Sequence, residues 1–354
     1  MQNIHRYAKR VTIAAFIVLL IATIFYTFNR HLYFFLLVFA GILLAVLLSG
    51  ITNWFVNKLH VRREVGLLIS SILFFGSIIG AFWLLAPTVG KQVQEMRSTV
   101  PEVVTQLEGW LSQYGWGQKI VEQMPNDMSK VLPQQQALFS RLSGVVSSTL
   151  SFLADLLIVI ITGLFFAANP PLYTRGVAKL FPVRYRSRVL EVLQKCYETL
   201  KLWLVGMLAA MTIIGISTAI GYSLIGLNLA FALAFIAFLF AFIPNIGPWI
   251  AGIPVVLVSL TQGPQMVLYS LLVYGGIQLV ESYWITPIIF QKTVDLPPAL
   301  LLFVQVLFGI VQGGLGLLLA APILAVIIVV VDEFYVKDFL ESDLQAPSVE
   351  TKSG

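Results

Sequence analysis

The stretch FIPNIGPWIAGIP, residues 242–254, opens a strongly apolar region that runs to Val331. Two further stretches break this region, QLVESYWITP at 278–287 and QGGLGLLLAAP at 312–322. Proline removes a backbone donor and glycine loosens a helix, so each break leaves backbone groups without an intrahelical partner. Lipid cannot satisfy these groups, and irregular backbone at membrane depth is tolerated only inside protein or beside a wet cavity. The breaks therefore predict interrupted helices that line a path for a solute.

The composition is that of an integral membrane protein. Of the 354 residues, 58% are hydrophobic and only 11% are charged, and the mean hydropathy is +0.89. A soluble domain carries about 25% charged residues. The composition and the long apolar runs predict an all-α polytopic transmembrane protein with about eight spans, in which the C-terminal half contains Pro/Gly-broken helices or re-entrant hairpins.

Signatures of catalysis and metal binding are missing from the sequence. Cys196 is the single cysteine, which excludes an internal disulfide. The three histidines, His5, His31 and His60, lie at or outside the ends of the predicted spans. No HExxH, GxSxG or Gly-rich phosphate-binding loop is present. We therefore expect no enzyme, no cofactor and no metal site.

Apolar runs and charge divide the chain into four parts. Residues 1–87 are predicted to form a transmembrane hairpin plus a third span, and 88–144 an outward-facing amphipathic segment or a solvated connector. Residues 145–336 are predicted to form a transmembrane transport core that includes a cytoplasmic amphipathic helix at 175–201. Residues 337–354 are predicted to be a largely disordered cytoplasmic tail.

Lysine and arginine predict the orientation. More than half of the 22 basic residues lie in 1–10, 58–63 and 175–201. These segments fall on one side of the membrane if each clear apolar run crosses once. The positive-inside rule places that side, and with it both termini, in the cytoplasm. Because the basic residues flank apolar spans, the net charge of +5 does not indicate nucleic-acid binding.

Charged residues within the apolar runs are the first candidates for the site, because a charge at membrane depth is costly. Glu281 is the stronger case, with Gln278 one turn earlier on the same helix face and Pro287 freeing backbone carbonyls beyond it. An interfacial glutamate capped by Lys292 is the alternative. Asp155 is the second candidate, either titrating during transport or hydrogen-bonding across a helix interface.

The broken segments supply the remaining candidates. The amide of Asn245 can both donate and accept a hydrogen bond, so this segment could hold a neutral polar solute or form only a tight turn. Gln305 and Gln312 lie about two turns apart on one helix, and the second is followed by glycines. The predicted path residues are Pro244, Asn245, Gly247, Pro248, Gln278, Glu281, Pro287, Gln312, Gly313, Gly314 and Pro322.

At these segments the chain resembles the autoinducer-2 exporter family of bacterial permeases. The resemblance rests on FIPNIGPWIAGIP, on QLVESYWITPIIF followed by LPPALLLF, and on GGLGLLLAAPILAV. Order and spacing agree from about Leu150 to Val331, whereas the earlier half agrees in layout only. One departure is FFAANPP, where Asn169 stands at a position that is Asp in many members of the family. A role that needs a carboxylate there is not available to this chain.

The resemblance implies a multi-pass permease of the bacterial inner membrane that exports a small solute, with the quorum-sensing signal autoinducer-2 as the namesake. It also implies a homo-oligomer. We expect proton-coupled export, with Glu281, Asp155 and Lys292 as candidate coupling residues. A cation/proton antiporter is the alternative, as the resemblance also implies, and a passive channel or a membrane scaffold are further readings. The expected partners are the solute or ion and membrane lipids.

Overall fold

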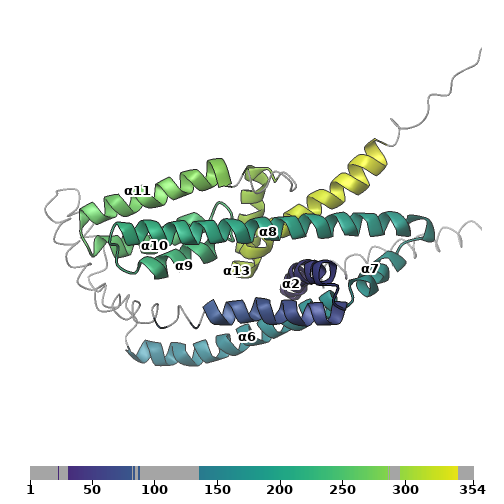
Figure 1. Ribbon diagram of the computed structural model, residues 1–354, viewed down its shortest axis with the longest axis horizontal. Coiled ribbons are helices and arrows are strands. Elements are labelled where there is room, and N and C mark those ends of the chain that lie inside the picture. The colour runs from purple at the N-terminus through teal and green to yellow at the C-terminus, as the bar shows by residue number, and fades with distance from the viewer. Residues whose placement is uncertain are drawn as a thin grey trace, which may run out of the picture.

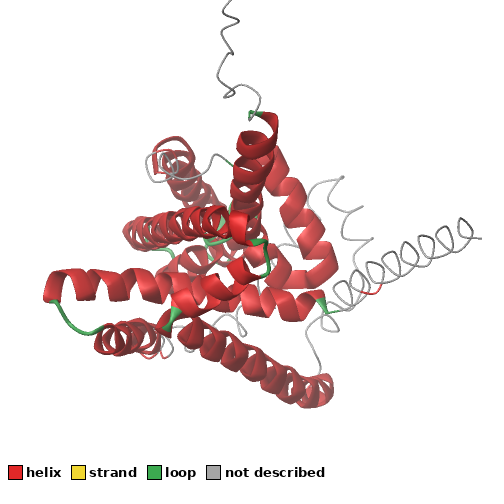
Figure 2. Ribbon diagram, turned by 90° about the vertical axis from the view of Figure 1, so that its right-hand side faces the viewer, coloured by secondary structure: helices red, strands yellow, loops and turns green. Residues whose placement is uncertain are grey.

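The computed structural model describes residues 31–81, 135–285 and 296–341, together with the isolated positions 23, 83, 87 and 287; within 135–285, side chains are described from residue 151. Every regular element in these residues is a helix (Figure 2). Most of the predicted outward-facing segment, 88–134, and Lys292 lie outside the described residues.

Five helices in the described part of the chain are long and apolar enough to cross a membrane. The first three are α2 (Leu32–Leu59), the helix Arg63–Ala81, and the Ser151–Ala168 part of α6 (Gln135–Ala168). The fourth, Val183–Leu224, contains α8 (Arg186–Leu224). The fifth, Pro298–Leu340, joins α13 (Pro298–Val331) to the π-helix η3 (Asp332–Leu340). These helices confirm the predicted all-α polytopic fold.

Helix α8 is the central helix, against which most of the other described helices pack (Figure 1). It is 39 residues long, and the shorter helices gather around one of its ends. The sequence prediction of a separate amphipathic helix at 175–201 differs from what is found. Helix α7 covers Pro170–Lys179, and residues 186–201 are continuous with the apolar span that follows them. The helix continues because no proline or glycine intervenes and its buried stripe extends from Val189 into the span.

The first broken stretch forms a helical hairpin. Helix α9 (Ala230–Phe240) and helix α10 (Gly247–Leu260) pack against each other. They are about 16 and 21 Å long, shorter than the ~30 Å hydrocarbon core. A Cβ on Gly247 would lie 1.9 Å from the Phe240 carbonyl oxygen, so only glycine permits this approach. These lengths favour a re-entrant hairpin over two crossings.

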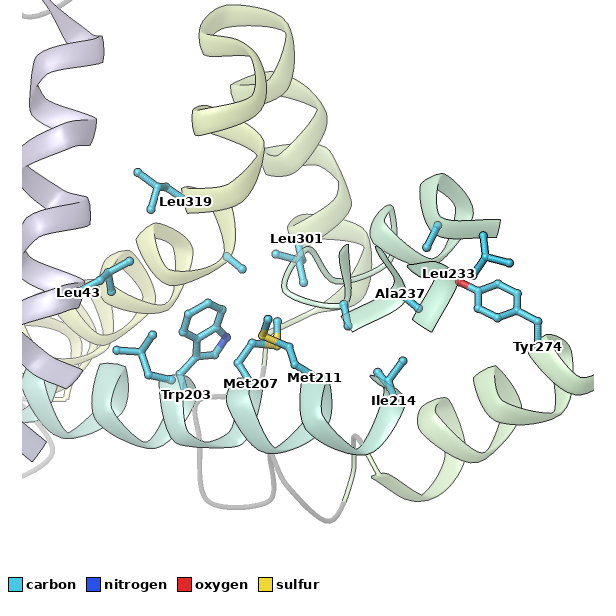
Figure 3. Close-up of a cluster of buried hydrophobic side chains, with 14 of the residues drawn as sticks. Leu43, Trp203, Met207, Met211, Ile214, Leu233, Ala237, Tyr274, Leu301 and Leu319 are labelled. Carbon is cyan, nitrogen blue, oxygen red and sulfur yellow. The ribbon is translucent and has the colours of Figure 1, made fainter. Parts of the chain in front are cut away.

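Helix α13 also doubles back, at Gly313. That residue has φ 65° and ψ −145°, a conformation essentially restricted to glycine. A Cβ on Gly309 would lie 3.6 Å from the Leu317 side chain, although residues eight apart along a straight helix are about 12 Å apart. Figure 3 shows the two arms side by side, with Leu301 on one and Leu319 on the other. The first arm, 298–312, is about 22 Å long, which favours a re-entrant segment.

The main core lies where α8 meets α2, the first hairpin and α13. Trp203, Met207 and Met211 of α8 point into it, facing Leu43 of α2 and Leu319 of α13 (Figure 3). The short helix Pro264–Val280 (α11) packs on α10 and α8 and completes the arrangement. Both hairpins are thereby held against one long helix.

Candidate transport path

Gln305 connects the two hairpins. Its Nε2 donates a hydrogen bond of 2.9 Å to the carbonyl oxygen of Pro244, at the turn of the first hairpin. The Gln305 side chain is fully buried, and its Oε1 has no hydrogen-bond partner among the described residues. Buried polar atoms are usually satisfied, so an exception calls for an explanation. An amide oxygen with spare capacity beside a broken helix is a site where a polar solute or water can donate a hydrogen bond.

Tyr274 of α11 makes the corresponding contact at the start of α10. Its hydroxyl donates a hydrogen bond of 2.7 Å to the carbonyl oxygen of Pro248. Its ring lies in van der Waals range of a Cβ placed on Gly252, at 3.4 Å. Side chains from α13 and α11 thus satisfy carbonyls on both sides of the turn. This is how irregular backbone is tolerated inside an apolar bundle.

The predicted path residues of the hairpins occupy different environments. Asn245 is exposed at the turn, in the left-handed region at φ 64°, and Gly247 is buried. Pro248 is half-buried in the first turn of α10. Gln312 is half-buried, and Gly313 and Gly314 are exposed at the tip of the α13 hairpin. The remaining hairpin residue, Pro322, is buried in the second arm of α13.

Glu281 begins a π-helix, Glu281–Ile285, that follows α11 directly. The predicted departure from α-helical geometry before Pro287 is therefore present. Glu281 is half-buried, and its Oε2 is buried without a hydrogen-bond partner among the described residues. Gln278, one turn earlier, is half-buried as well, while Pro287 is exposed. An unpartnered carboxylate oxygen is costly to bury, which keeps Glu281 a functional candidate.

Asp155 lies at a different interface. Its Oδ2 accepts a hydrogen bond of 2.5 Å from the hydroxyl of Tyr33, which joins α6 to α2. The same two helices approach closely at Gly41, where an added Cβ would lie 2.8 Å from Thr162. The interface hydrogen bond anticipated for this aspartate is present. The structure does not bring Asp155 together with Glu281 in any contact of the described residues.

Two polar residues of α8 were not singled out from the sequence. Thr218 and Tyr222 are fully buried, and neither hydroxyl has a hydrogen-bond partner in the described part of the chain. They lie one turn apart, and Gly221 between them packs against Val273 of α11. Their i, i+4 spacing within an apolar run was the available signal. Their hydroxyls add hydrogen-bonding groups to the α8 face that borders α11.

A helical membrane bundle with two short hairpins, broken backbone and unpartnered buried polar atoms has the design of a membrane transport protein. The sequence model of the AI-2E family of transporters matches residues 12–336. The chain belongs to this family, which confirms the resemblance drawn from the three broken segments.

Two bacterial relatives agree with this placement. The chain is 23% identical over 338 residues to YueF of Bacillus subtilis (strain 168), which covers 92% of each protein. It is 24% identical over 299 residues to YrrI of the same organism, covering 83% of this chain and 84% of the relative. Both relatives carry names that mark them as candidate transport proteins. The family and these names indicate a transporter and not an enzyme.

Proposed function

We propose that this protein exports a small polar solute across the bacterial inner membrane, along a path formed by the two helical hairpins. The observation that carries the proposal is the junction between Gln305 and the Pro244 carbonyl. Here two broken segments meet, and the Gln305 Oε1 has no partner among the described residues. Such a junction offers a solute hydrogen-bonding groups at a point where an apolar bundle otherwise has none. An autoinducer-2-like signal fits the polar character of these groups.

We further propose that a proton gradient drives export through Glu281. Its buried carboxylate oxygen lacks a hydrogen-bond partner in the described residues and can accept a proton without breaking an existing contact. The same observation favours cation/proton antiport as the second candidate function, because a carboxylate that releases its proton can attract a cation. The two functions differ in what moves against the proton, and flux measurements separate them.

The test uses purified full-length protein in liposomes. Uptake of autoinducer-2 and of Na⁺ or K⁺ is measured with and without an imposed pH gradient, for the wild type and for Glu281→Gln. The glutamine keeps the shape and hydrogen-bonding capacity of Glu281 but cannot carry a proton. We expect gradient-driven flux to fall at least about tenfold in Glu281→Gln, while flux down a solute gradient remains.

The matched control is Glu198→Gln. Glu198 is an exposed glutamate of α8 whose Oε1 accepts a hydrogen bond from Gln194. This variant removes one carboxylate without touching the hairpins, so wild-type coupling is expected. Wild-type gradient dependence in Glu281→Gln would remove Glu281 from coupling. Wild-type flux that does not depend on the pH gradient would instead indicate a passive channel.

A further inference from the structure

A groove between α2 and α8 lies on the surface of the bundle, apart from the two hairpins. Its volume is about 280 Å³. Val46, Gly50 and Trp54 line it from α2, at successive helical turns, and Lys201, Leu204 and Val205 line it from α8. Every lining side chain except that of Lys201 is apolar. A groove of this volume can hold a length of acyl chain.

Gly50 shapes this groove. A Cβ placed on Gly50 would meet the aliphatic stem of Lys201 at 3.6–3.9 Å. The lysine stem therefore lies along α2 and contributes apolar surface, in the way that long basic side chains extend toward a membrane interface. Trp54 is 55% exposed, so its ring faces the surroundings of the bundle and not the core. Tryptophan is enriched at the level of lipid headgroups.

Two cations border the groove. Neither Lys201 nor Lys58 forms a hydrogen bond or ion pair with any residue that the structure describes. Lys58 instead lies over the Trp54 ring, with its Nζ 5.6 Å from the ring centroid. Lys195, by contrast, pairs with Glu191 at 3.1 Å. The nearest acid along α8, Glu198, already accepts a hydrogen bond from Gln194. The groove thus combines apolar walls with unneutralised positive charge.

We propose that this groove is a binding site for an anionic phospholipid of the bilayer. One acyl chain lies along Val46, Gly50 and Val205, and the phosphate lies between Lys201 and Lys58. Both lysines stand where the apolar sequence of their helix ends, which is the level of the headgroups. Basic pockets between transmembrane helices bind anionic headgroups, and the charge of this site complements them. The site does not depend on the proposed transport path.

Trp54 supplies the readout. Full-length protein is reconstituted in phosphatidylcholine nanodiscs that contain an equal fraction of either brominated phosphatidylglycerol or brominated phosphatidylcholine. Bromine quenches nearby tryptophan, and the Trp54 contribution is the difference between each protein and the same protein carrying Trp54→Phe. We expect stronger quenching of Trp54 by brominated phosphatidylglycerol. Lys201→Gln and Lys58→Gln should each lower the relative affinity for that lipid about fivefold.

The control is Lys179→Gln, which removes an exposed lysine of α7 that does not line the groove and should keep the preference. Gly50→Val fills the groove and should reduce Trp54 quenching by both lipids. Size-exclusion profiles and helical circular dichroism establish that each variant is folded. Equal quenching by the two lipids, or a preference that survives the double lysine variant, overturns the proposal. Absence of Trp54 quenching, as expected if a second copy of the chain covers the groove, overturns it too.

Discussion

A glutamine buried in an apolar helix lowers stability unless its amide finds partners, because the amide gives up its hydrogen bonds to water. Gln305 finds one partner, the Pro244 carbonyl, and that carbonyl also accepts a 2.7 Å hydrogen bond from the Ile246 amide. The contact therefore joins the two hairpins but leaves the amide oxygen of Gln305 without a hydrogen-bond partner among the described residues. At the residue scale, it is the most specific polar interaction between the broken segments.

Gln305→Leu tests this junction. Leucine has a similar volume but cannot donate to Pro244, so we expect a loss of about 1 kcal/mol in the free energy of unfolding and a clear fall in solute flux. Gln312→Leu is the control for stability, since Gln312 is half-buried and has no hydrogen-bond partner within the described residues. Thermal unfolding in detergent and flux in liposomes measure the two effects. A leucine variant with unchanged flux would place the path elsewhere.

At the scale of elements, both hairpins depend on glycine, at one position in the first and at two in the second. In the first, Gly247 permits contact with the Phe240 carbonyl. In the second, Gly316 lies where a Cβ would be 2.3 Å from the Phe308 carbonyl oxygen, and Gly313 makes the turn at φ 65°. A side chain at Gly247 or Gly316 would overlap backbone atoms, and a side chain at Gly313 would have to adopt a disfavoured backbone conformation. A change of rotamer relieves neither problem.

Gly313→Ala and Gly314→Ala form a matched pair on adjacent residues. Neither added Cβ meets an atom within 4 Å, but only Gly313 has a positive φ. We expect Gly313→Ala to destabilise the hairpin by about 1–3 kcal/mol. Gly314→Ala should be neutral or slightly stabilising, because alanine favours a helix by about 1 kcal/mol over glycine. Hydrogen exchange of residues 305–320 reports the difference. Equal protection in both variants would show that α13 does not turn at Gly313.

At the scale of the whole molecule, a cluster of ion pairs fastens the C-terminal helix to the start of α8. The carboxylate of Glu333, whose side chain is only 4% exposed, pairs with Arg188 at 2.9 Å, Lys195 at 2.8 Å and Lys337 at 2.6 Å. Asp338 accepts two hydrogen bonds of 2.9 Å from Arg188. A buried carboxylate is tolerated only with such partners. The start of α8 and the end of η3 therefore lie on the same side of the membrane.

Reporter fusions test this topology. A cytoplasmic reporter inserted at Val183 and one fused after Asp338 should give the same signal, since the ion pairs join these regions and the basic residues orient them inward. A reporter at Gly117, which lies outside the described residues, is expected to give the periplasmic signal. An external signal from Val183 would contradict the proposed orientation, and opposite signals from Val183 and Asp338 would contradict the ion-pair cluster.

The sequence alone determined the class of the fold and the places where helices break. Both follow from local chemistry: runs of apolar residues specify membrane helices, Pro244 lacks a backbone donor, and Gly313 can adopt a positive φ. A break near Glu281 was anticipated from Pro287 for the same local reason, but the π-helical form of that break was not. Family membership followed from the order and spacing of these breaks, which a sequence displays directly.

Only the tertiary structure decided whether the chain passes through a break or turns back. A helix that is apolar all round has no preferred face, so hydropathy cannot distinguish a kink at Gly313 from a reversal. The partners of the buried polar groups were equally hidden, because Gln305 bonds to a residue 61 positions away and Tyr274 to one 26 positions away. Thr218 and Tyr222 were not singled out from the sequence, because their burial depends on how the helices pack. Burial and long-range pairing are properties of the assembled helices, and they decide which polar residues matter.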